Sequence, residues 1–199
     1  VGSAIERFRS DAKAEGGLVT IGGYQSHNAA GHEIPHKEAK WFFVQLTRVS
    51  APWAFVKGEP FRTISSLELG GSLLAVMLLL DPNENPEDDL YGCLSVGGLT
   101  DNSGNRFAVT RMLTTKWHLV AFMAELSTQL ESRNMLFEMS WVRREQNTEA
   151  DAITNGDTKW LHPKHRIETK MDQLPFLVLN DLLVKVAAFY GTIETVNLE

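Results

Sequence analysis

The chain has 199 residues and a formal net charge of −6. This length is sufficient for a hydrophobic core, and the negative charge argues against a protein that binds nucleic acids through a generally basic surface. The single cysteine, Cys93, excludes an internal disulfide and favours an intracellular location, nuclear or cytoplasmic. No secretion signal is visible, and the most apolar run, residues 73–80, is too short to cross a membrane.

The N-terminal residues predict a β-hairpin. Residues 4–10 are expected to form a short strand with Asp11 at its end, followed by a turn that reaches Gly17. The β-branched segment 18–24 would return beside this first strand, and the aromatic segment 39–46 is a third strand candidate. An aspartate ahead of a glycine pair is also ordinary turn chemistry, so this pattern alone does not indicate a function.

The polar segment 25–40 is predicted to be a loop, although it contains the letters HEIPH at residues 32–36. This string matches a zinc-protease pattern, in which both histidines lie on one helical face and the glutamate acts as the base. Pro35 stands inside the turn that would have to be helical, where it removes an amide and clashes with the preceding turn. We therefore interpret the match as accidental.

Apolar residues at helical spacing predict a mostly buried helix from about Ser65 to Leu80, after an irregular segment at 49–61. Glu68 falls in the first turn, where a carboxylate either caps the helix or serves a site. Gly70 and Gly71 each disfavour a helix by about 1 kcal/mol relative to alanine. Either a close approach between backbones requires these glycines, or the sequence has decayed.

The next expected elements are a strand and a long helical region. Residues 90–99 read as a strand that runs into the letters TDN at residues 100–102. Asp101 would then lie at one edge of the sheet, although it could also cap the following helix. Residues 106–134 carry an amphipathic pattern, which predicts one long helix or two with a break.

The most informative stretch follows the last predicted strand, residues 135–142. A polar loop leads from that strand into a helix that should begin at Asn147 or Thr148. Asp151 falls in the first turn of this helix, where the helix dipole favours negative charge. A carboxylate after a strand also lies where α/β proteins carry their chemistry.

Residues 174–190 predict a closing helix near the C-terminus. Bulky apolar residues at helical spacing normally pack on a core. The side chains expected to do so here are Leu177, Leu182, Leu183 and Val186.

Several of these segments together resemble the ribonuclease H domain of retroelement polyproteins, over residues 5–157. The letters NTEADAI at residues 147–153, after a strand ending in Trp141, are similar to the last active-site segment of that family. The block before it, WVRREQN, resembles the family's W-V-P-R-E-x-N, with Arg143 in place of the proline. The TDN at residues 100–102 resembles the third catalytic segment.

The resemblance implies a ribonuclease H-like α/β fold of three layers, with a mixed five-stranded sheet and helices on both faces. It places the domain at residues 1–157 and a C-terminal extension at 158–199. It also implies cleavage of the RNA strand of RNA–DNA hybrids with two Mg²⁺ ions, for which Mn²⁺ could substitute. The implied catalytic and metal-binding residues are Asp11, Glu68, Asp101 and Asp151. The expected nucleic-acid contacts are Asn102, Asn105, Arg143, Arg144 and Asn147.

The resemblance further implies an upstream reverse transcriptase domain in a parent polyprotein. The chain begins at Val1 and not at methionine, which suggests a fragment of something longer. The family often carries a mobile histidine near the site, for which His165 is a candidate beside its ordinary role in a solvated loop. The alternative to an active enzyme is a decayed copy that serves as a structural or interaction module.

Overall fold

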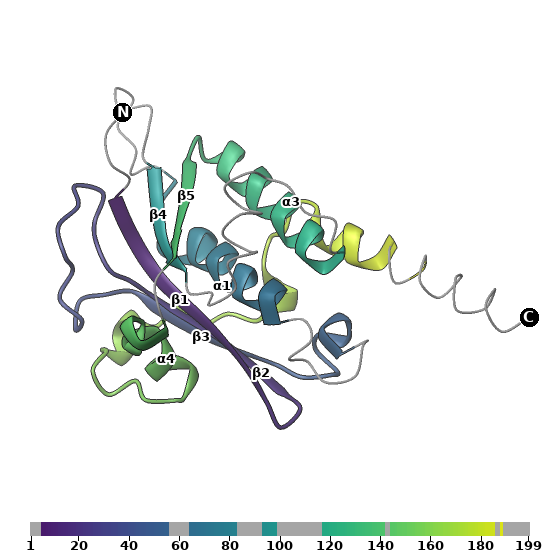
Figure 1. Cartoon of the computed structure of the whole chain (residues 1–199), viewed down its shortest axis with the longest axis horizontal. Coiled ribbons are helices and arrows are strands. Elements are labelled where there is room, and N and C mark those ends of the chain that lie inside the picture. Colours follow the sequence, from purple (N-terminus) through teal and green to yellow (C-terminus); the bar gives the residue numbers. More distant parts are fainter. Residues whose placement is uncertain are drawn as a thin grey trace, which may run out of the picture.

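The computed structural model describes residues 5–55, 64–82, 93–98, 117–141, 144–185 and 188. They form an α/β fold around one sheet with the strand order β3-β2-β1-β4-β5 (Figure 1). The strands are β1 (Ile5–Glu15), β2 (Leu18–Gln25), β3 (Trp41–Leu46), β4 (Cys93–Gly98) and β5 (Leu136–Trp141). The helices are α1 (Ile64–Leu79), α3 (Trp117–Ser132) and α4 (Thr148–Thr154). Short 3-10 helices are η1 (Pro52–Phe55), η3 (Arg144–Gln146), η4 (Pro163–His165) and η5 (Met171–Gln173).

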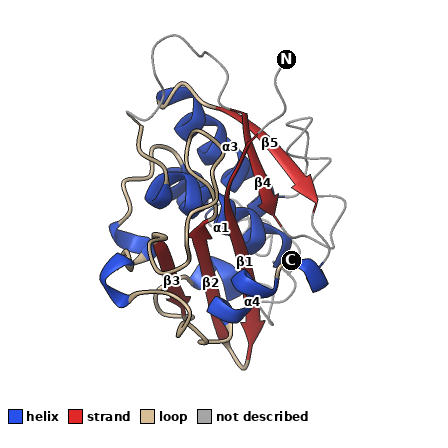
Figure 2. Ribbon diagram, turned by 90° about the vertical axis from the view of Figure 1, so that its left-hand side faces the viewer, coloured by secondary structure: helices blue, strands red, loops and turns tan. Residues whose placement is uncertain are grey.

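Helices cover both faces of the sheet. Helices α1 and α3 pack together on one face, and α4 packs against β1 and β2 on the other (Figure 2). No helix in the described part of the chain is both long and apolar enough to cross a bilayer.

The N-terminal hairpin is confirmed, but its first strand is longer than expected. β1 pairs with β2 as far as Glu15, so Asp11 lies within the strand, opposite Gly22, and not at its end. The turn is limited to Gly16 and Gly17, whose φ angles of +59° and +75° suit a tight two-residue hairpin turn. Pairing with β2 extends the strand through Lys13, Ala14 and Glu15, although these residue types do not favour strands by themselves.

The other half of the sheet is parallel. β4 pairs with β1 and ends at Gly98, opposite Ser10. β5 pairs with β4, and its Trp141 lies opposite Gly98. The carboxyl ends of β4 and β5 therefore meet beside the middle of β1, one residue before Asp11. Beyond Ser10, no described strand pairs with β1 on this side.

The two glycines of α1 are explained by close packing. A Cβ atom at Gly71 would lie 3.2 Å from Ser10 Oγ, on the sheet beneath the helix. One at Gly70 would lie 3.1 Å from the ring of Phe122, which belongs to α3. The predicted helix is thus confirmed as α1, and a close approach of its backbone to both neighbours is the reason for its glycines.

A third glycine allows α4 to lie against the sheet. Ile153 of α4 is fully buried, and a Cβ atom at Gly22 would lie 2.5 Å from its Cγ2 atom. Gly22 faces the same side of the sheet as Asp11, its partner across the hairpin. The missing side chain at Gly22 therefore brings α4 within reach of Asp11.

We expect Gly22→Ala to destabilise the protein by about 1–3 kcal/mol, because the added methyl group overlaps Ile153. Ile153→Ala should also be destabilising, by about 2–5 kcal/mol, because it leaves a cavity. In the double variant the two changes should compensate, so its free energy of unfolding should fall by less than the sum of the single effects. Urea denaturation measures all three, and strictly additive effects would argue against the contact.

The C-terminal segment packs on the main core. Met171, Leu174 and Leu179 are buried in it, and Leu182 and Leu183 are packed against it. The structure is helical over 179–185. Packing is thus confirmed for two of the four predicted residues, whereas the prediction for Leu177 is wrong, since it is 54% exposed. Leu177 precedes the helical turns, where its backbone and not its side chain is held. Val186 lies outside the described residues.

Candidate active site

Asp11 is held by α4, which lies on the same face of the sheet. The hydroxyl of Thr154 donates a hydrogen bond to Asp11 Oδ2 at 2.8 Å. Thr154 is itself buried, with 5% of its surface exposed, and its hydroxyl also lies 3.0 Å from the backbone oxygen of Asp151. One side chain thus contacts two of the carboxylate-bearing residues that the sequence singled out.

Asp151 lies one helical turn from Thr154 and is held by Asn155. The Asn155 amide donates to Asp151 Oδ2 at 3.0 Å and to the backbone oxygen of Asp151 at 2.9 Å. The other atom of that amide, Oδ1, accepts a hydrogen bond from Lys13 Nζ at 2.6 Å. Lys13 follows Asp11 by two residues in β1, so both side chains face the same side of the sheet.

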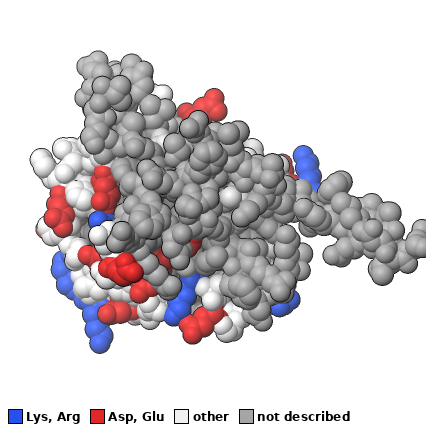
Figure 3. Space-filling view, viewed as in Figure 1, with Lys and Arg blue, Asp and Glu red and all other residues white. Residues whose placement is uncertain are grey.

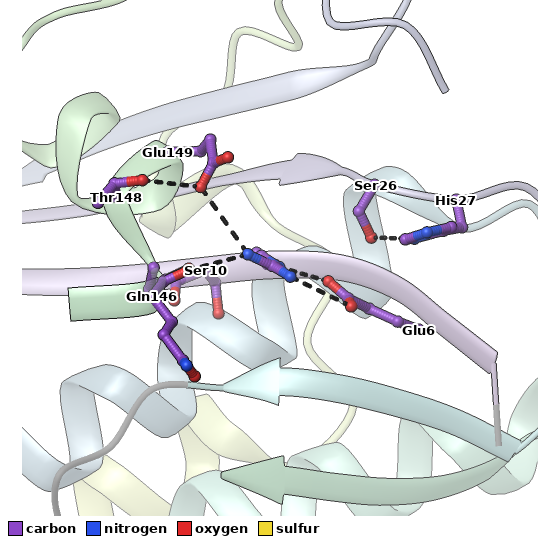
Figure 4. Close-up of polar contacts among 9 residues, drawn as sticks. Glu6, Ser10, Ser26, His27, Gln146, Thr148 and Glu149 are labelled. Carbon is purple, nitrogen blue, oxygen red and sulfur yellow. Dashed lines mark hydrogen bonds and ion pairs between the residues drawn. The ribbon is translucent and has the colours of Figure 1, made fainter. Parts of the chain in front are cut away.

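Arg9 fixes the start of α4 to the same strand. Its Nη1 donates to the backbone oxygen of Gln146 at 3.1 Å and lies 3.8 Å from Glu149 (Figure 4). Its remaining donors contact the carboxylate of Glu6 (Figure 4). The hydrogen bond to Glu6 is the main cause that raises the pKa of Arg9. The strand therefore contacts α4 at both ends of the helix.

Asn147 is the N-cap of α4, as predicted, but its side chain does not cap the helix. The side chain is fully buried, and its Nδ2 donates to the backbone oxygen of Ser10 at 3.2 Å. Ser10 is the last residue of β1 that pairs with β4. The Asn147 side chain therefore binds the backbone of β1 at the point where its pairing with β4 ends. With no exposed surface, Asn147 cannot contact nucleic acid directly, which corrects the expectation from sequence.

Glu68 comes from the opposite side of the sheet. It lies on α1, three residues before Gly71, which contacts Ser10 on the face away from α4. One of its carboxylate oxygens is shielded from solvent. The structure brings Asp11 and Asp151 to one face and Glu68 to the other. Among the described residues, no three His, Cys, Asp or Glu side chains form a group that could hold a metal ion.

The remaining expected site residues fall mostly outside the described residues. These are Asp101, Asn102, Asn105 and Arg143. Arg144 begins the 3-10 helix η3, directly ahead of the segment that contacts β1. The roles proposed for these five residues stay predictions.

The HEIPH string does not form a helix, which agrees with its interpretation as an accidental match. Residues 32–36 belong to the loop between β2 and β3, where Pro35 accepts turn hydrogen bonds from Glu38 and Ala39. His165 lies in η4, with its ring 5.7 Å from that of His162. Neither group supplies the helical histidine pair that a zinc protease requires.

A cavity of about 370 Å³ opens beside the end of α4. Polar side chains line much of it, including Lys13, Gln45, Thr154 and Asn155. On the face drawn in Figure 3, acidic and basic side chains are interspersed over the described part, without a broad basic surface. The polar side chains that line the cavity are available for local contacts with a charged ligand.

No family model matches the chain, and no curated protein matches it. The solved structures that are similar to the chain in fold include two RNase H proteins. One is the N-terminal RNase H domain of rv2228c from Mycobacterium tuberculosis, solved as a fusion with maltose-binding protein: 14% identity, TM-score 0.47, covering 76% of this chain and 91% of that one. The other is RNase H1 from the halophilic archaeon Halobacterium salinarum NRC-1: 12% identity, TM-score 0.48, covering 75% of this chain and 94% of that one.

Proposed function

We propose that the chain is a ribonuclease H-type endonuclease that hydrolyses the RNA strand of RNA–DNA hybrids. We further propose that it derives from a retroelement polyprotein with an upstream reverse transcriptase domain. The observation that carries the proposal is the hydrogen bond from Thr154 to Asp11, because it joins the strand of Asp11 to the helix that carries Asp151. These two segments are more than a hundred residues apart in sequence.

The order of segments around this contact supports the same function. β4 ends beside Ser10, and Asp101 follows the end of that strand by three residues in the sequence. β5 ends beside the same point and leads into η3 and α4, which carries Asp151. Strand ends that meet at one point of an α/β sheet are where such folds bind their ligands.

Glu68 can join this set around the end of β4. Among the described strands, β4 pairs with β1 only as far as Ser10, one residue before Asp11. We propose that Glu68, on the helix α1 that packs against β1, approaches Asp11 past this end of β4. We therefore retain Asp11, Glu68, Asp101 and Asp151 as the proposed catalytic and metal-binding residues.

The proposed donor set suits Mg²⁺ or Mn²⁺, because these hard cations prefer carboxylate oxygens. Two such ions, held by these carboxylates, would supply an activated water for attack on the phosphodiester and positive charge for the leaving oxygen. The chain's own part is to hold mutually repelling carboxylates in place, which Thr154 and Asn155 do for Asp11 and Asp151. Contacts to the 2′-hydroxyl would distinguish RNA from DNA. Asn102, Asn105, Arg143 and Arg144 are the proposed contacts to phosphate and sugar.

The test is cleavage of a labelled RNA–DNA hybrid by the whole chain. We expect cleavage of the RNA strand with Mg²⁺ or Mn²⁺ and not with Ca²⁺, whose looser coordination holds an attacking water poorly in line. An absence of cleavage at every metal concentration would overturn the proposal. The decayed interaction module would then be favoured, provided that the chain binds Mg²⁺ no better than its Asp11→Asn variant.

A further inference from the structure

Contacts between β1 and α4 hold both Asp11 and Asp151. Asp11 belongs to the strand, and the side chain that binds it, Thr154, belongs to the helix. Asp151 belongs to the helix, and Asn155, which binds it, is itself held by Lys13 of the strand. Asp11 is therefore held by the helix that carries Asp151. Asp151 is held, through Asn155, by the strand that carries Asp11.

The chemistry of the Asn155 amide makes this arrangement directional. An ammonium group only donates hydrogen bonds, so the atom of Asn155 that faces Lys13 must be the carbonyl oxygen. The NH₂ group must then face Asp151, which as a carboxylate only accepts. Lys13 is held in turn by Glu15, 2.8 Å away on the same strand, which lowers the pKa of Glu15. The orientation of the amide thus follows from its two charged neighbours.

Of the two connections between the strand and the helix, the one through Thr154 reaches its aspartate directly across the interface, by a single hydrogen bond. The Thr154 side chain is also shielded from water. Its hydroxyl is buried between the strand and the helix, where competition from solvent is small. A hydrogen bond to a charged acceptor in such a position is stronger than a neutral one. The bond also selects one oxygen of Asp11 to face the helix, which restricts rotation of the carboxylate.

We propose that Thr154 and Asn155, the latter oriented by Lys13, are positioning residues that set the spacing of Asp11 and Asp151 for a divalent cation. This inference rests on the proposed function. Carboxylates that are already in place lose little freedom when a cation binds, whereas mobile ones must first be ordered against their own repulsion. Loss of a side chain that orients a metal ligand typically weakens metal binding by about 10–100-fold.

The test is the Mg²⁺ affinity of the whole chain, measured by isothermal titration calorimetry below the melting temperature of every variant. Thr154→Val keeps the shape of the side chain but removes the donor, and we expect its Kd for Mg²⁺ to rise by about 10–100-fold. Thr154→Ser retains the hydroxyl and should restore most of the affinity. Thr158→Val, in the loop after α4, is the matched control and should bind like the unmodified chain.

Lys13→Met provides a second, independent variant. Lys13 lies on the surface, with 37% of its side chain exposed, so its replacement should leave the protein folded. It should still raise the Kd, by about tenfold, because Asn155 loses the contact that orients it. If Thr154→Val does not fold, this variant decides the question.

The outcomes separate the two proposals. If the unmodified chain binds Mg²⁺ and Asp11→Asn weakens binding, but Thr154→Val and Lys13→Met bind normally, the positioning role is refuted and the proposed function stands. If Thr154→Ser binds as weakly as Thr154→Val, the hydroxyl is not what matters, which also refutes it. If the unmodified chain binds no more tightly than Asp11→Asn, the metal site itself is wrong, and both proposals fall.

Discussion

Asp11→Asn, Asp101→Asn and Asp151→Asn are each expected to lower cleavage of the RNA strand by roughly two orders of magnitude or more. Each change removes a negative charge from the proposed donor set and so weakens its hold on the cations. The carboxamide can still accept the hydrogen bonds from Thr154 and Asn155 at the first and last of these positions, so the fold should survive. Without metal, the variants should be more stable than the unmodified chain, because repulsion within the cluster is relieved.

Single-turnover cleavage of a hybrid over a range of Mg²⁺ concentrations, together with thermal unfolding in a chelator, measures both effects. Glu131→Gln is the control: this carboxylate is exposed on α3 and lies outside the proposed set. Equal cleavage rates for Asp101→Asn and Glu131→Gln would refute the two-metal assignment. A loss of metal-free stability in Asp11→Asn would show that its hydrogen bonds outweigh the repulsion.

Most strands and helices could be predicted because their patterns are local. The β-branched run of β2 and the apolar spacing of α1 each indicate their own structure. The end of β1 could not be predicted in this way, because Lys13, Ala14 and Glu15 become strand only by pairing with β2. The glycines of α1 were recognised as unusual, but only the positions of Ser10 and Phe122 give their reason.

The candidate site was predicted unevenly for a similar reason. Asp151 is marked by its position after a strand and at the start of a helix. Thr154 and Asn155, three and four residues later, read only as the end of that helix, since Asn155 and Gly156 are typical stop residues. Their second role becomes visible only when β1 and α4 are placed side by side. The prediction for Asn147 was wrong in the other direction. A polar residue in a loop was expected to be exposed and to contact a ligand, but the fold buries it.

The largest feature missed in the sequence is a buried carboxylate in α3. Glu125 lies among the apolar residues of an amphipathic helix and has no exposed surface. Its Oε1 accepts hydrogen bonds from the backbone N–H groups of Leu177, Val178 and Leu179, at 2.6, 3.0 and 3.2 Å. These groups lead into the helical turns at 179–185 beside α3 (Figure 1). The first N–H groups of a helix have no partner within it, and the positive end of its dipole favours an anion.

We therefore expect Glu125→Ala to lower the free energy of unfolding by about 3 kcal/mol or more. The change leaves three backbone N–H groups without this acceptor, that of Leu179 being buried, and opens a cavity beneath the C-terminal segment. Glu125→Gln should cost less, because an amide oxygen can still accept from the same groups, although without the charge. Removing residues 174–199 should also destabilise the chain, since Leu174 and Leu179 belong to the main core.

Urea denaturation of these variants, with Glu131→Ala as an exposed control on the same helix, measures the effect. The control should change the free energy of unfolding by no more than about 0.5 kcal/mol. In the chain without residues 174–199, Glu125→Ala should lose most of its effect, because the N–H groups that it leaves unpaired are then absent. If Glu125→Ala and Glu131→Ala unfold at the same urea concentration, Glu125 does not anchor the C-terminal segment. If Glu125→Ala costs as much in the shortened chain as in the full one, its contribution lies within α3, where Gln129 is its neighbour at 3.4 Å.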